Sequence, residues 1–178
     1  VFAAAVILHP EKPIIGLDDS KKLSAKQRDA LAIQIKAEAL AYGIGSASAA
    51  EIDELNILQA TFLAMRRALA QIAPAPLEVW LDGNQKPKVS PEWPWHTHCF
   101  IQGDGQYACI AAASILAKSA HDAQMVELSR DFPEYELMQN QGYGTARHCL
   151  LIQRFGSSKH HRKTFKIKNN LNKNMLLL

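Results

Sequence analysis

The chain has 178 residues, a length that predicts one domain with a full-sized hydrophobic core and argues against a repeat array. Apolar residues make up 48% and charged residues 21% of the sequence, which excludes a disordered or fibrous protein. The net charge of +3 is uneven, because residues 159–178 hold six basic and no acidic residues and leave 14 basic against 17 acidic residues before them. A basic end of this kind either contacts phosphates or is simply solvated, and charge alone leaves both interpretations open.

Strands and helices alternate along the sequence, which predicts an α/β fold. Two capping boxes mark helix starts, Ser24 with Gln27 and Ser48 with Glu51, because each serine can accept a bond from the residue three positions on and receive one back. The predicted elements in order are a strand at 2–8, a helix from 24 to about 41, a strand at 42–47, a short helix after 48, a helix through 58–72, strands at 77–81 and 98–102, a helix from 107 to about 130, and a helix from 145 to 155.

Two aspartates stand where such folds place chemistry. Asp82 follows a short apolar strand, and the carboxyl ends of strands are the usual position of catalytic groups in open α/β sheets. Asp122 lies about three turns into the helix after the next strand. Oxygen ligands of this kind suit Mg²⁺ or Mn²⁺. The alternative is that Asp82 belongs to an ordinary turn and that Asp122 is a solvated helix residue.

Other patterns give weaker signals. The segment Gly142 to Thr145 predicts either a loop that admits a phosphate or sugar, with Tyr143 as a stacking platform, or a plain helix entry with an exposed aromatic. The Gly-Asp-Gly turn at residues 103–105 lacks the third glycine of a dinucleotide-binding fingerprint and the Lys-Ser/Thr of a P-loop, so we reject nucleotide binding. No Cys-x-x-Cys or His-x₃-His pair exists to anchor a zinc site, so the sequence does not favour one. The residues considered for zinc were His96, His98, Cys99, Cys109, His148 and Cys149.

The cysteines and the apolar runs also bear on location. Three cysteines without disulfide-like spacing indicate reduced thiols, and the longest apolar run, residues 1–8, is too short to span a membrane. We therefore expect a cytoplasmic protein without membrane contact.

Six segments along the chain form one pattern. The segments are Asp19-Ser20-Lys21-Lys22-Leu23-Ser24, Asn56-Ile57-Leu58-Gln59-Ala60-Thr61, Asp82-Gly83-Asn84, residues 110–118 with Asp122, Gly142-Tyr143-Gly144-Thr145, and His161-Arg162-Lys163-Thr164-Phe165. Their order and spacings are those of bacterial ribonuclease HII, and the chain resembles that family over residues 1 to about 165. The remaining residues, 166–178, have no counterpart, and we expect a disordered basic tail there.

The resemblance implies a ribonuclease H-like mixed sheet flanked by helices. It also implies an endonuclease that cuts RNA in RNA/DNA hybrids and at ribonucleotides embedded in duplex DNA, leaving 5′-phosphomonoesters, with Mg²⁺ or Mn²⁺ as cofactor and a monomer as the complete form. Asp82 and Asp122 match two of the four metal-binding carboxylates of that family. The residues that would contact the nucleic acid are Ser20, Lys21, Lys22, Asn84, Tyr143 and Arg162.

The chain departs from the family at its start. Family members begin with a central strand that carries an Asp-Glu pair and Gly-Arg-Gly, and this sequence begins after it. We interpret the sequence as an incomplete chain of a normal enzyme, expected to be inactive and poorly folded alone. If it is active, the nearest carboxylates to complete the site are Asp18, Asp19 and Asp104. The alternatives are a non-catalytic nucleic-acid-binding protein that has lost its metal site and, less favoured, a ribosome-associated RNA-binding protein.

Overall fold

The computed structural model describes residues 1–165, and the predicted tail at 166–178 lies outside the described residues. The strands are β1 (Phe2–Ile7), β2 (Ala41–Ser46), β3 (Glu78–Asp82) and β4 (His96–Phe100). The helices are α1 (Ala25–Glu38), α2 (Ala49–Leu55), α3 (Ile57–Leu69), α4 (Ala108–Asp131), α5 (Leu137–Asn140) and α6 (Ala146–Phe155), with short 3₁₀ turns η1 (Gly103–Gly105) and η2 (Pro133–Tyr135). None of the helices within residues 1–165 combines the length and the apolar character needed to cross a membrane.

The strands form an antiparallel pair and a parallel pair. β1 pairs with β2 from Phe2 opposite Ser46 to Ile7 opposite Ala41. β3 and β4 run parallel, with Asp82 opposite Phe100. The predicted mixture of antiparallel and parallel strands is therefore confirmed, although within residues 1–165 the two pairs are separate two-stranded sheets.

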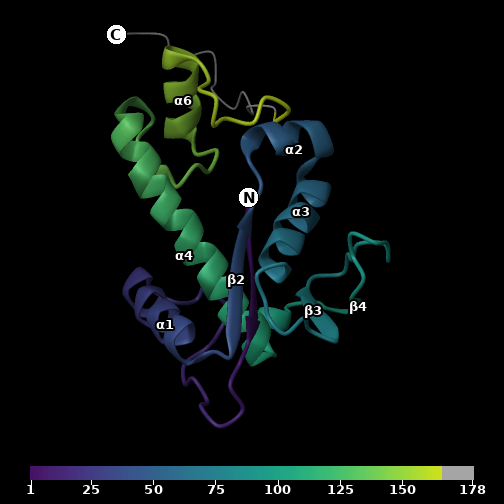
Figure 1. Ribbon diagram of the computed structural model, residues 1–178. Helices are drawn as coiled ribbons and strands as arrows, with labels where there is room; N and C mark the ends of the chain where they lie inside the picture. The colour runs from purple at the N-terminus through teal and green to yellow at the C-terminus, as the bar shows by residue number, and fades with distance from the viewer. Residues whose placement is uncertain (166–178) are drawn as a thin grey trace.

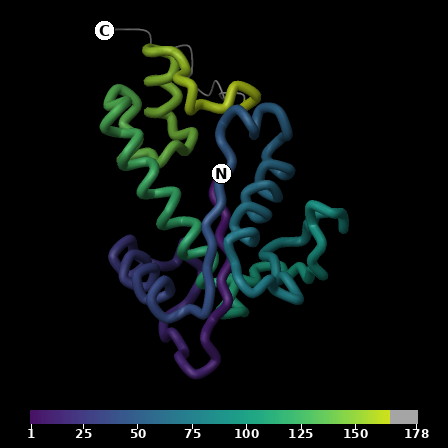
Figure 2. The backbone as a smooth tube through the Cα atoms, in the orientation of Figure 1, coloured from purple at the N-terminus to yellow at the C-terminus, as the bar shows by residue number. Residues whose placement is uncertain are grey.

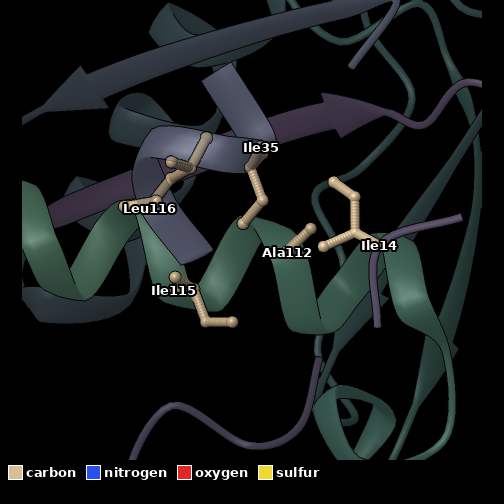
Figure 3. Packing of buried hydrophobic residues seen from close by; sticks show 6 residues of the cluster. Ile14, Ile35, Ala112, Ile115 and Leu116 are labelled. Carbon is tan, nitrogen blue, oxygen red and sulfur yellow. The ribbon is translucent and has the colours of Figure 1, made fainter. Parts of the chain in front are cut away.

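Helices cover both faces of the β1–β2 pair (Figure 1). The tube drawing in Figure 2 shows the same arrangement, with α1 beside the first half of α4 on one side and α2 and α3 on the other. The largest fully buried side chains are Ile35 of α1 and Ile115 and Leu116 of α4. Figure 3 shows these residues packed with Ala112 and with Ile14 from the segment between β1 and α1. This cluster fixes the position of α1, and with it the segment that precedes α1, on α4.

Small residues set the distance between α3 and β2. Gly43 and Gly45 lie on β2, and a Cβ atom on them would collide with the backbone carbonyl oxygens of Ala68 and Ala64. Because α3 presents alanines and β2 presents glycines, the helix packs directly on the backbone of the strand. A larger side chain at either glycine would push α3 away.

Local signals in the sequence predicted the helix starts well. Ser24 and Ser48 both form the expected capping boxes, and Thr145 caps α6 by accepting a bond from the backbone of His148. The helix predicted to run to about residue 41 ends at Glu38, because the Leu40 N–H donates to the carbonyl of Ile7 and begins the β1–β2 pairing. β4 begins two residues earlier than predicted, since His96 pairs with β3.

Candidate active site

Asp82 is the last residue of β3, and its carboxylate is held by the backbone of the segment after β4. The N–H of Gly103 donates to Asp82 Oδ1 at 2.9 Å. The next backbone N–H along β3, that of Gly83, donates to the Phe100 carbonyl at 2.8 Å, so the parallel ladder continues to the end of both strands. The carboxylate is therefore fixed at the shared carboxyl edge of β3 and β4 and remains exposed to solvent.

A second carboxylate, Asp104, lies at the same edge. It belongs to η1, directly after Gly103, and the residue is only 7% exposed. Burial raises the pKa of Asp104, and the negative charges of Asp82 and Asp19 raise it further. Asp19 and Asp82, which belong to distant parts of the sequence, thus both act on Asp104, and a cation at this position would reduce the repulsion.

Asp19 and Asp104 border an open cleft of about 260 Å³. Asp19 and Lys22 line one wall, and residues 102 and 104–106 line the other. The segment that carries Asp19 is shaped by its own side chains: Asp19 Oδ1 accepts the N–H of Lys21 at 2.9 Å, and Lys22 Nζ contacts Asp18 Oδ1 at 3.1 Å. The contact with Asp18 raises the pKa of the Lys22 ammonium, which stays charged at the mouth of the cleft.

Asp122 lies within α4, away from this edge of β3 and β4. It is fourteen residues beyond Ala108, the first residue of α4, which corresponds to about 21 Å along the helix axis at about 1.5 Å per residue. Asp82, by contrast, is bound to Gly103, which precedes that helix. The structure therefore does not bring Asp82 and Asp122 to the separation of about 4 Å that two shared cations require.

The Asp122 carboxylate already has three partners. Arg28 of α1 donates to Oδ2 at 3.1 Å, and Lys118 and His121 contact Oδ1. Burial opposes ionisation of Asp122, but the bonds from Lys118 and His121 outweigh it and lower the pKa. Arg28 also donates to the backbone carbonyls of Ser20 and Leu23, so the Asp122 pair ties the segment before α1 to α4.

The predicted nucleic-acid contacts fall into several places. Lys21, Lys22 and Asn84 are exposed, the two lysines next to the cleft and Asn84 two residues beyond Asp82. Ser20 is only 6% exposed, and its carbonyl accepts a bond from Arg28. Its backbone therefore shapes the lysine-bearing segment.

Tyr143 is 59% exposed and lies beside the middle of α4. Its ring centre is 6.2 Å from that of His121 and 5.7 Å from Lys118 Nζ. The backbone carbonyl of Tyr143 contacts Nδ1 of the buried His148 at 2.9 Å, which holds the loop while the phenol ring stays free. An exposed ring on a fixed loop is suited to stacking on a ligand.

Arg162 belongs to a segment that docks on α2. Asp53 accepts the backbone N–H groups of Lys163 and Thr164 at 2.8 and 2.9 Å and the Thr164 hydroxyl at 2.6 Å. The Arg162 guanidinium lies 3.7 Å from the centre of the Phe165 ring, and burial lowers its pKa. The predicted phosphate contact is thus part of an ordered segment that packs on the body of the protein.

Asp104 is the site residue that the sequence analysis left among the secondary candidates. The sequence did contain a signal for Asp104. Asp82 ends one strand, Asp104 follows the next strand, and the ends of parallel neighbours meet at one sheet edge. The Gly-Asp-Gly turn is similar to part of a nucleotide-binding loop, and this similarity obscured the signal.

The chain matches known proteins along nearly its whole length. The family model described as Ribonuclease HII matches residues 1–168. The ribonuclease HII of Thiobacillus denitrificans is 49% identical over 165 residues, which cover 93% of this chain and 79% of that protein. The ribonuclease HII of Bordetella pertussis is 50% identical over 165 residues, which cover 93% of this chain and 80% of that protein.

Two solved structures are similar in fold. The crystal structure of ribonuclease H2 from Pyrococcus horikoshii matches with a TM-score of 0.70 at 20% identity, over 94% of this chain and 95% of that chain. The ribonuclease HII in a complex with PCNA from Archaeoglobus fulgidus matches with a TM-score of 0.65 at 22% identity, over 85% of this chain and 79% of that chain.

Proposed function

We propose, from the premise that this chain belongs to the ribonuclease HII family, that Asp82 and Asp104 are its metal-binding carboxylates. Membership makes the protein an endoribonuclease of a family that acts on RNA/DNA substrates and depends on divalent metal ions. The observation that carries the assignment is the position of Asp104 and Lys22 in one cleft, next to Asp82, which is bound to Gly103 and whose charge acts on Asp104.

The donor set fits a hard divalent cation. Carboxylate oxygens are the protein ligands that Mg²⁺ and Mn²⁺ prefer. Asp104 is buried next to the charges of Asp82 and Asp19, and a cation between these groups would offset their mutual repulsion. When bound, divalent ions supply an activated water and stabilise the leaving oxygen of a phosphodiester.

The protein's own groups have separable roles around that chemistry. The Gly103 N–H holds one oxygen of Asp82, and because the residue is exposed, its second oxygen is open to a cation. Asp104 is held on a short 3₁₀ turn, so both carboxylates are positioned before substrate arrives. Lys22 places a positive charge at the same cleft, where it would attract and orient a phosphate group.

We extend the proposal to the substrate. RNA/DNA hybrids and duplex DNA with an embedded ribonucleotide both present phosphates to Lys21, Lys22 and Arg162, with Asn84 beside the scissile group. Tyr143 would stack on the sugar where RNA meets DNA, which its 59% exposure supports. Ser20 contributes through its backbone by shaping the lysine-bearing segment.

Three finer assignments belong to the same proposal. We assign Mg²⁺ or Mn²⁺ as the metal from the oxygen ligands. The cysteines Cys99, Cys109 and Cys149 are all free thiols, which supports a cytoplasmic location. The complete protein is assigned as a monomer.

Single substitutions test the metal assignment. In the chain joined to an N-terminal strand of the family type that carries the Asp-Glu pair, Asp82→Asn and Asp104→Asn should each abolish Mn²⁺-dependent cleavage of an RNA/DNA hybrid. In the same background Asp122→Asn should keep measurable cleavage at a temperature where the variant is folded. Circular dichroism melts establish folding for each variant. The competing assignment from the sequence pairs Asp82 with Asp122, and cleavage lost in Asp122→Asn but kept in Asp104→Asn would establish it. Hybrid binding without cleavage in the wild-type protein would instead support a non-catalytic nucleic-acid-binding protein.

A further inference from the structure

The strand register of β3 and β4 brings three metal-ligating side chains together at the start of both strands. Glu78 of β3 lies directly opposite His96 of β4. His98 follows two residues later, and since side chains alternate along a strand, it points to the same face as His96. Glu78 and His98 are twenty residues apart in the sequence. Their spacing matches none of the sequence patterns that are typical of zinc sites.

The distances suit one metal ion. The candidate ligand atoms of Glu78, His96 and His98 all lie within 4.8 Å of one another. Glu78 Oε2 and His98 Nε2 are 3.7 Å apart, and the two imidazole ring centres are 4.7 Å apart. Ligand atoms around a tetrahedral ion with bonds of about 2.1 Å lie about 3.4 Å from each other. All three side chains are at least partly exposed, so small rotations about their side-chain torsions can bring the ligand atoms from their present separations to those of a bound ion.

We propose that Glu78, His96 and His98 form a metal site for a borderline divalent transition metal such as Zn²⁺. Two imidazoles and one carboxylate are the ligand set of many zinc sites, whereas Mg²⁺ prefers oxygen ligands alone. The Trp80 Nε1–H donates to Glu78 Oε2 in a long hydrogen bond of 3.4 Å. Hydrogen bonds of this kind orient the side chains that bind a metal ion. The bound ion would cross-link β3 and β4 at the end opposite to Asp82.

The site is separate from the catalytic cleft and does not rest on the proposed function. Glu78 and Asp82 are four residues apart on one strand, a distance of about 13 Å. Between them on the same face Trp80 packs against Phe100 and Tyr107, with ring centres 5.0 Å apart in both contacts. A metal at Glu78 therefore has no ligand in common with Asp82 or Asp104.

Zinc titration tests the site. The full chain is titrated with Zn²⁺ against a chromogenic chelator, with millimolar Mg²⁺ present to occupy the carboxylate cleft. We expect one zinc per chain, and His98→Ala and Glu78→Gln should each weaken zinc binding by about tenfold or more, because even outer-shell partners change metal affinity by about 10–100-fold. His160→Ala, which removes an exposed histidine elsewhere, is the matched control and should bind zinc like the wild type.

Two further variants locate the metal. His148 and His161 form a second imidazole pair, with their Nε2 atoms 3.2 Å apart, and zinc binding lost in His161→Ala but kept in His98→Ala would overturn the proposal. Zinc binding that survives both His98→Ala and Glu78→Gln, or that disappears in Asp104→Asn, would also overturn it. Wild-type zinc affinity in Asp104→Asn, together with weakened affinity in His98→Ala, supports it whatever the cleavage assay shows.

Discussion

Replacement of Asp122 by asparagine should destabilise the protein, because this carboxylate is the common partner of Arg28 and Lys118. The side chains of Asp122 and Arg28 are 24% and 13% exposed, so solvent screens the pair only in part. Arg28 also holds the carbonyls of Ser20 and Leu23, and loss of its anion would loosen the lysine-bearing segment before α1. Asparagine keeps the size of the side chain and one acceptor oxygen but removes the charge.

The size of the effect follows from the exposure. Hydrogen bonds to charged groups contribute about 1.5–3 kcal/mol, and removal of one partner from a fully buried pair costs about 3–5 kcal/mol. For this partly buried pair with one acceptor retained, we expect a loss of about 2 kcal/mol in the free energy of unfolding. In a chain of this size that lowers Tm by about 4–8 °C.

The assay is urea unfolding of the wild type, Asp122→Asn and the control Asp131→Asn, which changes an exposed aspartate at the end of the same helix. The pKa of Asp122 is lowered in the folded protein, so its contribution is present above the unfolded pKa of about 3.9 and is lost as pH falls through the folded value. The stability difference between wild type and Asp122→Asn should therefore shrink below about pH 4. An unchanged or increased stability of Asp122→Asn at pH 7 would refute this reasoning, because it would show that the contacts of the carboxylate with Arg28 and Lys118 do not stabilise the fold.

Three further variants, one of them a double substitution, test the substrate surface and the docked segment. Tyr143→Ala should reduce cleavage at a single embedded ribonucleotide by about 5-fold to 150-fold with little change in Tm, since base or sugar stacking contributes about 1–3 kcal/mol; a large fall in Tm with unchanged cleavage would make the ring structural. Lys21→Ala combined with Lys22→Ala should reduce the slope of log K against log salt for duplex binding by about 1.8 in magnitude, and an unchanged slope would show that neither lysine contacts phosphate. Asp53→Ala should speed tryptic cleavage in residues 159–165, because it removes three acceptor contacts, and wild-type cleavage rates would show that the segment is held by other contacts.

The sequence predicted the parts of the fold that depend on neighbouring residues. Ser24 and Ser48 act within one turn of their own helices, so their capping boxes could be read directly. The early start of β4 could not be predicted from the sequence, because His96 is extended through its pairing with β3 and not through its own preference. The separation of the strands into two pairs is likewise a property of the tertiary structure.

The residues of the candidate site also divide into those that the local sequence predicts and those that only the tertiary structure brings together. Asp82 was predicted from its place at a strand end, and in the structure it ends β3 and is bound to Gly103, while its metal-binding role stays a prediction. Asp122 and Asp104 were harder to tell apart, because both follow β4 and only the length of α4 shows that Asp122 lies far along the helix. The cluster of Glu78 with His96 and His98 depends on cross-strand register, which spacing along one chain does not contain.

Binding of Mn²⁺, followed by electron paramagnetic resonance, tests the central claim most directly because it needs no substrate. Free Mn²⁺ gives a six-line spectrum that diminishes on binding, so the titration reads occupancy of the carboxylate site. The account predicts that Asp82→Asn and Asp104→Asn each weaken Mn²⁺ binding by at least about tenfold, whereas Asp122→Asn binds Mn²⁺ like the wild type. Wild-type Mn²⁺ affinity in Asp104→Asn, with affinity lost in Asp122→Asn, would contradict it.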